Sequence, residues 1–324
     1  MIKTPLCELL DIEVPIIQAP IWPATSPELV AAVGEAGAIG SLGAVFGSAD
    51  SVTAEIKAIK ALTDRPFIVN HVISQLDEDA FRATLEAKPA AISFALGDPA
   101  GVVERAHEVG AKVIHQVHTV SQARAAADRG VDVIVAQGSE AGGQGMTAGV
   151  GAMALVPQVV DAVDPIPVVV AGGVADGRGL AAALALGAQG ANVGTRFLAS
   201  EEASSDPSWR EQIIAAESED AVRFETWSEL FPPAHGSAYA VVPRVLRTTF
   251  VERWQGRPEE ARAQAEDLRA EVMAVVARRA PHEIVPFTGQ TTGLISDVLP
   301  AGEIVRRMVR EAEEALERAA TLRG

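Results

Sequence analysis

Two glycine-rich turns follow consecutive apolar segments between residues 168 and 198. Gly172-Gly173 end one apolar run, and Gly194-Thr195 end the next. Glycine lets a backbone approach a ligand closely, and amides at such turns hold phosphate without Lys or Arg. In α/β barrels the loops after the seventh and eighth strands often form this kind of site. These four residues are therefore candidates for a cofactor phosphate, although the glycines could also serve only as tight turns.

A third glycine-rich loop, QGSEAGGQG, spans Gln137–Gly145 after another apolar segment. Such a loop can lie flat against a planar ligand, which would place Glu140 and Gln144 at a catalytic mouth. It is also typical of a flexible surface loop. No GxGxxG follows the first apolar run and no GxxxxGK[ST] occurs, so a Rossmann dinucleotide site and a P-loop are both disfavoured.

Polar side chains follow two further apolar segments. Asn70 ends the third run, and its amide can donate and accept hydrogen bonds to an amide-bearing ring or a ribityl hydroxyl. His71 and His118 each come just past an apolar run and are candidates for a general base. The alternative for each of these residues is a hydrogen bond to its own strand end or loop. No histidine pair has HExxH spacing, so we expect no metal site.

The elements that would position these residues are short apolar runs that alternate with Ala-rich helical stretches. The runs lack polar alternation, which is typical of parallel strands covered on both faces. The expected strands are Ile16–Ala19, Ala38–Leu42, Phe67–Asn70, Ala91–Phe94, Lys112–Val117, Asp132–Ala136, Pro167–Ala171 and Ala191–Val193. Helix starts are expected at Ser26-Pro27, Asp98-Pro99, Thr119 and Asp176. Eight βα units in a row predict a closed (β/α)₈ TIM barrel.

The βα rhythm ends after the eighth strand. We expect residues 1–200 plus 287–324 to form the barrel and residues 201–286 to form a helical lobe that supplies the substrate pocket or lid. Within the lobe, Pro258–Ala280 has an apolar helical stripe that predicts core packing. A last amphipathic helix, Glu303–Thr321, would close the barrel.

Composition and charge disfavour several classes of function. Lys+Arg number 27 and Asp+Glu number 43, so the formal net charge is −16 and the surface repels nucleic-acid phosphates. Cys7 is the one cysteine, which leaves no disulfide framework and no Cys-based zinc site. No signal-length apolar core and no charge-free apolar run of about 18 residues occurs. We expect a cytoplasmic protein with a small-molecule substrate and neither a nucleic-acid nor a membrane partner; the oligomeric state stays open.

Six stretches, spread in order over most of the chain, resemble the nitronate monooxygenase (2-nitropropane dioxygenase) family of FMN-dependent barrels. That family is related to an FMN-dependent enoyl-acyl-carrier-protein reductase and to NAD(P)H:quinone reductases. The matching stretches are PIIQAP (Pro15–Pro20), FIVN (Phe67–Asn70), QGSEAGGQG (Gln137–Gly145), AGGVADGRGLAAALALGA (Ala171–Ala188), NVGTRFLAS (Asn192–Ser200) and GQTTGLI (Gly289–Ile295).

The resemblance implies FMN bound over the carboxyl end of the barrel. The residues expected to contact it are Ala19, Pro20, Ile21, Asn70, Gln137, Glu140, Ala141, Gly142 and Gly143, with Gly172, Gly173, Gly194 and Thr195 at its phosphate.

One position departs from the family pattern. Members resembling this chain usually read EAGGH, with the histidine poised over the flavin, whereas here that residue is Gln144. An amide accepts no proton at neutral pH, so Gln144 is expected to donate a hydrogen bond to a nitro or carbonyl oxygen. His71 or His118 would then have to replace the base, if one is needed.

The resemblance implies oxidation of a nitronate or nitroalkane with dioxygen. One alternative is an NAD(P)H-dependent FMN reductase that acts on a quinone or an enoyl thioester. Another is a flavin-binding protein without turnover. The Gln144 substitution keeps both alternatives open.

Overall fold

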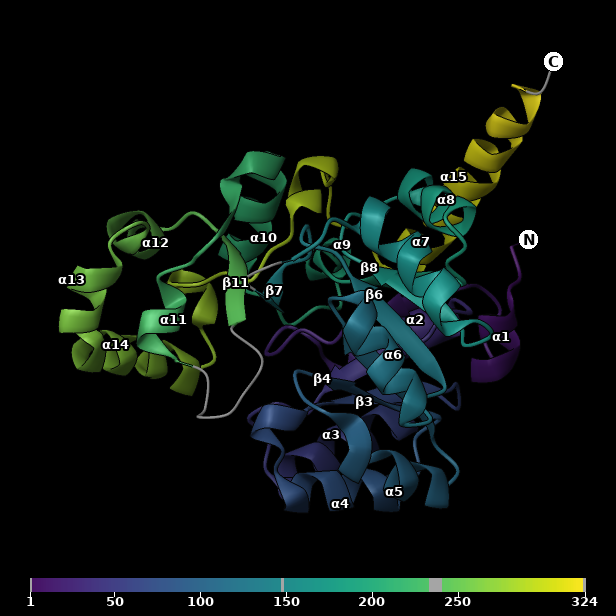
Figure 1. Ribbon diagram of the computed structural model, residues 1–324, viewed down its shortest axis with the longest axis horizontal. Helices are drawn as coiled ribbons and strands as arrows, with labels where there is room; N and C mark the ends of the chain where they lie inside the picture. Colours follow the sequence, from purple (N-terminus) through teal and green to yellow (C-terminus); the bar gives the residue numbers. More distant parts are fainter. Residues whose placement is uncertain (1, 147–148, 233–240, 323–324) are drawn as a thin grey trace.

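A computed structural model describes residues 2–146, 149–232 and 241–322. Its centre is a parallel sheet surrounded by helices (Figure 1). The sheet has eight strands in the order β1-β9-β8-β6-β5-β4-β3-β2. The strands are β1 (Ile16–Gln18), β2 (Gly40–Gly43), β3 (Phe67–Val72), β4 (Ala91–Ala95), β5 (Lys112–Val117), β6 (Val133–Gln137), β8 (Val168–Ala171) and β9 (Gly190–Val193). All eight expected strands are confirmed.

The two ends of that strand order meet and close the barrel. Ile17 and Ile39 form a parallel bridge, in which the Gln18 amide donates to the Ile39 carbonyl over 2.9 Å and the Ile39 amide donates to Ile16 over 3.1 Å. The fold is therefore the expected (β/α)₈ TIM barrel, in which all strand ends point to one mouth.

Helices cover the outside of the barrel in the order expected for βα units. They are α2 (Pro27–Glu35), α3 (Ala49–Leu62), α4 (Glu78–Ala87), α5 (Val103–Glu108), α6 (Val120–Asp128), α7 (Ala152–Val163), α8 (Gly177–Ala185) and α15 (Ala301–Thr321). The side chains of Ser26, Thr119 and Asp176 accept amide hydrogens at the starts of α2, α6 and α8, as expected of N-caps. Asp98 caps a short 3-10 turn that precedes α5.

The core has two layers. The larger one packs the strands against the surrounding helices and includes Phe81, Phe94, Leu180 and Met308. The inner one fills the barrel and includes Ile17, Ile68 and Ile114. Helix α1 (Pro5–Leu10) closes the amino-terminal end of the barrel, where Cys7 is buried in the inner layer. Within the described ranges, no helix is both long and apolar enough to span a membrane.

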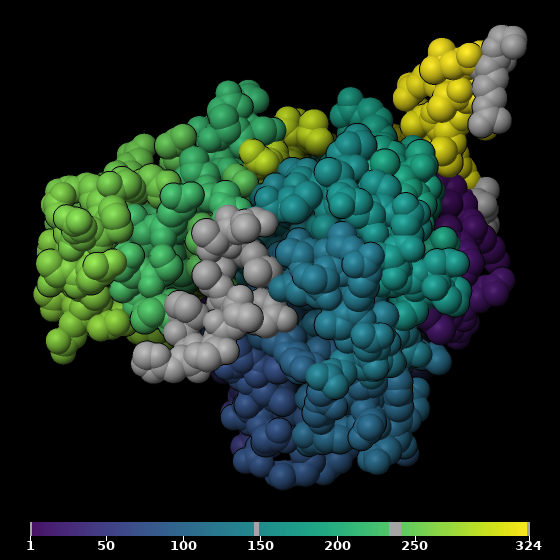
Figure 2. Space-filling view, viewed as in Figure 1, coloured from purple at the N-terminus to yellow at the C-terminus, as the bar shows by residue number. Residues whose placement is uncertain are grey.

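A lobe stands beside the barrel, green in Figures 1 and 2. Its helices are α10 (Pro207–Ala215), α11 (Trp227–Leu230), α12 (Thr249–Trp254), α13 (Pro258–Ala263) and α14 (Ala265–Ala277). The stripe expected as one helix over Pro258–Ala280 is thus two helices that meet at Gln264. Residues 233–240, which belong to the expected lobe, lie outside the described part of the chain.

The lobe also holds a three-stranded antiparallel sheet in the order β10-β11-β7. Strands β10 (Ala221–Arg223) and β11 (Val241–Leu246) come from the lobe, but β7 (Gly143–Met146) lies in the loop that follows β6 of the barrel. The expected helical lobe therefore also contains a small sheet. A loop of the barrel is built into the sheet of the lobe, which joins the two parts at the mouth.

Helix α15 packs along α8, and its last turns project beyond the body of the molecule (Figures 1 and 2). The contact is closest at Gly177, the first residue of α8. A Cβ at this position would lie 2.2 Å from the Ala312 nitrogen and 2.4 Å from the Met308 carbonyl oxygen of α15. Only glycine permits this approach.

Replacing Gly177 with Ala should therefore push α15 off α8 and destabilise the protein by about 1–3 kcal/mol, the usual cost of overpacking. Denaturant unfolding measures the change. Gly101→Ala is the matched control, because a Cβ there has no atom within 4 Å. Equal stabilities for the two variants would contradict the tight α8–α15 contact.

Candidate functional site

A cavity of about 220 Å³ opens at the carboxyl end of the barrel. Its walls come from the residues at or just past the ends of β1, β3, β6, β8 and β9. The expected cofactor residues that line it are Ala19, Pro20, Ile21, Asn70, Gln137, Glu140, Ala141, Gly142, Gly143, Gly172, Gly194 and Thr195. Gln144 lines it as well. The fold thus brings together nearly all the residues proposed from the sequence.

Gly173 is the one expected cofactor residue that does not line this cavity. Gly172 and Gly173 have φ angles of +86° and +78°, which side chains rarely adopt. A Cβ on Gly172 would lie 2.8 Å from the Ala141 nitrogen, whereas one on Gly173 would meet only a Glu140 carboxylate oxygen, at 4.0 Å. The first glycine is therefore required for packing and the second for the turn.

The loop after β9 reaches the cavity through Gly194 and Thr195. The Thr195 hydroxyl oxygen accepts the Gly289 amide hydrogen over 3.0 Å, so its own proton is available to a ligand. A Cβ on Gly194 would meet only Ile21 and Ala19, which follow the neighbouring strand β1, at 3.4 and 3.7 Å. This corner of the cavity therefore offers the Thr195 hydroxyl as a donor, next to the Gly194 backbone, which carries no side chain.

Amide side chains line the deeper wall. They are Asn70, Gln116, Gln137 and Asn192, one in the carboxyl-terminal half of each of four strands. Asn70 donates to the Ser93 hydroxyl over 2.9 Å, so it both anchors its strand end and faces the cavity. The Asn192 amide oxygen is buried and has no hydrogen-bond partner. An unpaired buried acceptor is costly. This oxygen is therefore available to accept a hydrogen bond from a ligand's N–H or O–H group.

Glu140 is held in the loop after β6. Both of its carboxylate oxygens lie within hydrogen-bond distance, 2.9 and 3.0 Å, of the Ala152 amide at the start of α7. Its backbone carbonyl accepts the Gln290 amide over 2.9 Å. Glu140 thus joins three segments, and its carboxylate is occupied by the first amide of α7.

Gln144 lies in β7, opposite Pro243 of β11. The Gln137 side chain donates to the Gln144 carbonyl over 3.2 Å. Arg244, also in β11, donates to the Ser139 carbonyl over 2.8 and 3.0 Å and so holds the start of the same loop. The lobe sheet therefore fixes the position of Gln144 at the cavity.

His71 does not reach the cavity. Successive residues of β3 face opposite sides, so Asn70 and Val72 line the cavity while His71 packs outside the barrel. Its Nε2 hydrogen-bonds the Thr84 hydroxyl of α4 over 2.9 Å, and its ring contacts Phe81 and Phe94. Burial lowers its pKa to about 4. The expectation that His71 faces the mouth is wrong.

His118 does not reach this cavity either. It is buried behind the loop after β6, beside a small separate cavity of about 10 Å³ that Gln137 and Arg244 also line. Burial lowers the pKa of His118 to about 4, and neither ring nitrogen has a hydrogen-bond partner. The expectation that it shares the mouth with His71 is wrong, because the chain of the β6 loop lies in between.

Sequence reasoning missed an aromatic rim formed by Trp22, Phe46 and Phe287. The Trp22 and Phe46 rings meet edge to face, with centroids 5.2 Å apart. Phe46 is 62% exposed and has a φ angle of +60°, unusual for a bulky residue. Nothing local in the sequence signals such a backbone, and Phe287 arrives from a distant part of the chain.

No group of three or more His, Cys, Asp or Glu side chains is arranged to hold a metal within residues 2–146, 149–232 and 241–322. His235 lies outside these ranges.

Known proteins are similar to this chain in sequence and in fold. A family model described as nitronate monooxygenase matches residues 3–84 and 79–311. A protein of Staphylococcus saprophyticus named probable nitronate monooxygenase is 34% identical over 267 residues, which cover 68% of this chain and 75% of that protein.

Two solved structures are similar over nearly the full length. FabK from Thermotoga maritima has a TM-score of 0.89 and 33% identity, and covers 99% of this chain and 100% of its own. The nitroalkane oxidase from Streptomyces ansochromogenes has a TM-score of 0.80 and 28% identity, and covers 96% of this chain and 99% of its own.

The buried histidines make a prediction about stability. Burial lowers the pKa of His71, His115 and His118 to about 4 from the ordinary 6.5. Below about pH 6.5 the unfolded chain takes up protons that the folded chain does not. The free energy of unfolding is therefore highest above this pH and falls as the pH is lowered toward 4. The expected loss is about 3 kcal/mol per histidine.

Denaturant unfolding between pH 7 and pH 4.5 measures this loss. His118→Gln removes one of the three groups, so its stability should depend less on pH than that of the wild type. Parallel pH profiles for the two proteins would contradict a neutral, buried His118.

Proposed function

The chain belongs to the nitronate monooxygenase family of flavin-dependent oxidoreductases, and we propose that it binds FMN in the barrel cavity and oxidises a preformed nitronate with dioxygen. One observation carries the choice of a nitronate. Among the described residues that line the cavity, Glu140 is the only ionisable side chain, and its carboxylate is bound to the start of α7. Within the part of the chain that the structure describes, the cavity wall therefore holds no ionisable side chain other than this engaged carboxylate.

The residues of the cavity fit FMN. Gly172, Gly194 and the Thr195 hydroxyl would hold the phosphate, with Gly173 shaping the turn beside them. The unpaired Asn192 oxygen and the neighbouring amides would meet the polar groups of the ribityl chain or the ring. When bound, FMN supplies a redox centre that accepts electrons from an organic substrate and passes them to dioxygen.

Gln144 decides which substrates can react. A neutral nitroalkane must lose a carbon-bound proton before it can give up electrons, and a positioned base usually contributes about 10²–10⁴-fold to such a step. A nitronate has already lost that proton. The Gln144 amide would donate a hydrogen bond to a nitronate oxygen and orient the substrate, but it would not remove a proton.

The aromatic rim indicates an apolar substituent on the substrate. Phe46 and Trp22 present ring surface at the mouth, and the Arg279 guanidinium lies 5.8 Å from the Trp22 ring centroid. Arg279 and Phe287 lie in the segment where the chain leaves the lobe and returns to the barrel. We therefore assign residues 201–286 the role of a lobe that completes the substrate side of the cavity.

A second candidate is an NAD(P)H-dependent reductase of a quinone or an enoyl thioester. The observation that favours it is again Gln144, because an amide donor suits a carbonyl oxygen as well as a nitronate oxygen. In this case a nicotinamide would have to bind at the aromatic rim and reduce the cofactor. Reduction by NAD(P)H separates this candidate from the first.

Gln144→His should restore a base and raise kcat/KM for a neutral nitroalkane by about 10- to 100-fold. Turnover of the matching nitronate should stay within about twofold, because that substrate needs no proton removal. Gln144→Asn is the control, since it shortens the side chain without adding a base. If Gln144→His changes neither activity, proton removal does not limit this site.

Phe46→Ala should raise KM for a nitronate with an apolar substituent by about 2- to 10-fold, which is the range expected from losing one aromatic contact. The value of kcat should be unchanged, because Phe46 lies at the rim. Leu62→Ala is the control, since Leu62 is 51% exposed on α3 and does not line the cavity. An unchanged KM in Phe46→Ala would remove the rim from the substrate site.

A further inference from the structure

A second cavity, of about 240 Å³, lies between the loop after β8, the loop after β9 and helix α15. Arg178, Arg196, Arg307 and Arg318 line it, and so do Asp176, Asp297, Glu311 and Glu314. These charges balance, so the cavity is the interior of an ionic network rather than a site for an anion.

Arg196 links this network to the proposed phosphate site. It follows Thr195 directly, but it lines the second cavity and not the first. Only 6% of the residue is exposed. Its guanidinium donates to the Asp297 carboxylate over 2.8 Å and to the Asp297 carbonyl over 2.7 Å. Arg196 thus binds the loop after β9 to Asp297 on the side that faces away from the first cavity.

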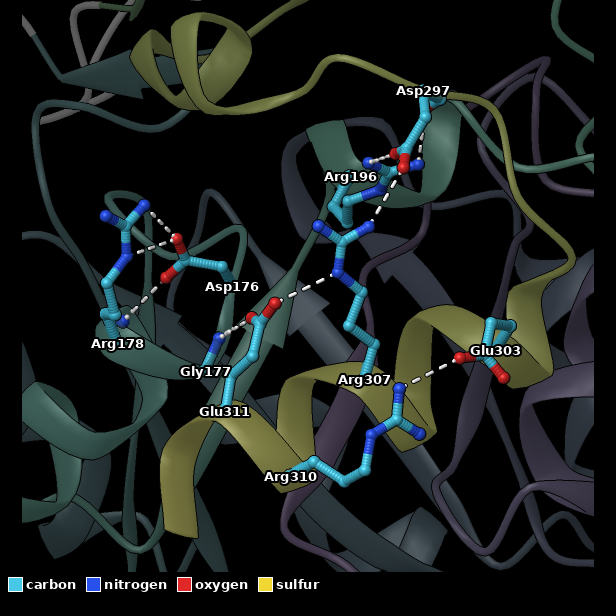
Figure 3. Close-up of polar contacts among 10 residues, drawn as sticks. Asp176, Gly177, Arg178, Arg196, Asp297, Glu303, Arg307, Arg310 and Glu311 are labelled. Atoms are coloured by element: carbon cyan, nitrogen blue, oxygen red, sulfur yellow. Dashed lines mark hydrogen bonds and ion pairs between the residues drawn. The ribbon is translucent and has the colours of Figure 1, made fainter. Parts of the chain in front are cut away.

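Arg307 of α15 joins Asp297 to the other loop. It donates to the second Asp297 carboxylate oxygen over 2.9 Å and to Glu311 over 2.9 Å. The other oxygen of Glu311 accepts the Gly177 amide over 3.0 Å, at the start of α8 and just past the loop after β8. Figure 3 shows this continuous path from Arg196 through Asp297, Arg307 and Glu311 to Gly177.

Asp297 is the member on which the path depends. Burial lowers the pKa of Arg196, and Asp297 opposes that effect. Burial also acts to raise the pKa of Asp297, but its contacts with Arg196 and Arg307 prevail and lower it. Removing one partner of a buried ion pair leaves a costly unpaired charge, whereas a half-exposed pair contributes less. Arg307 is half-exposed and Arg196 is buried.

We propose that Asp297, assisted by Arg307, is a positioning residue that fixes the two phosphate loops relative to each other by tying both to α15. This inference rests on the proposed binding of FMN. Without the Asp297 carboxylate, the buried Arg196 keeps its backbone carbonyl acceptors at Ala199 and residue 297 but loses its counter-charge, and the adjacent Thr195 moves with it. The walls around the ring and ribityl chain do not belong to this network, so they keep their positions.

The test is to titrate the apoprotein with FMN and with riboflavin, which lacks the phosphate, and to follow flavin fluorescence. Asp297→Asn should weaken FMN binding by about tenfold or more, equivalent to about 1.4 kcal/mol, and leave riboflavin binding within about twofold. Arg307→Gln should weaken FMN binding by a smaller factor, about two- to tenfold. Arg310→Gln is the matched control, because Arg310 binds Glu303 of the same helix and neither loop.

Two results would overturn the proposal. Unchanged FMN affinity in both Asp297→Asn and Arg307→Gln would show that the network does not position the phosphate. Equal losses for FMN and riboflavin would show a general loosening of the protein, and thermal unfolding of the apoproteins would reveal the same loosening. A wild type that binds neither flavin would instead refute the proposed function, and this inference with it.

Discussion

The mouth of the barrel depends on backbone contacts too close for a side chain. A Cβ on Gly172 would lie 2.8 Å from the Ala141 nitrogen, and one on Gly142 would lie 2.5 Å from the Gly289 nitrogen. These contacts draw together the loops after β6 and β8 and the segment that returns from the lobe. Gly289 in turn donates to Thr195, which adds the loop after β9. The cavity exists because glycine lets these four segments converge.

The same convergence limits the chemistry. Glu140 holds the β6 loop to α7, because its carboxylate accepts the Ala152 amide hydrogen. Gln144 is fixed by the pairing of β7 with β11, and its amide is a donor and acceptor that stays neutral. The site is therefore suited to binding and orienting a substrate that needs no deprotonation. Redox chemistry on a nitronate meets that condition.

Local patterns were sufficient to predict the barrel strands, the helix caps and most of the cavity wall. Each of those features depends on neighbours in sequence, such as the apolar run that ends in Gly172 or the Ser26 cap. The orientation of His71 needed the strand register, because one residue of difference turns a side chain from the cavity to the outer layer. Strand β7 needed its partner β11, about a hundred residues later in the chain. Phe46 and Asp297 acquire their roles only from contacts across the fold.

In the proposed function, a nitronate reduces the cofactor in this site, whereas a neutral nitroalkane or NADPH does not. The direct measurement is anaerobic stopped-flow of the FMN-loaded protein, in which the absorbance of oxidised flavin is followed after mixing with a nitronate, its neutral nitroalkane or NADPH. We expect rapid bleaching by the nitronate and persistent colour with the nitroalkane and with NADPH. Rapid bleaching by NADPH would contradict the proposed function and establish a nicotinamide-dependent reductase.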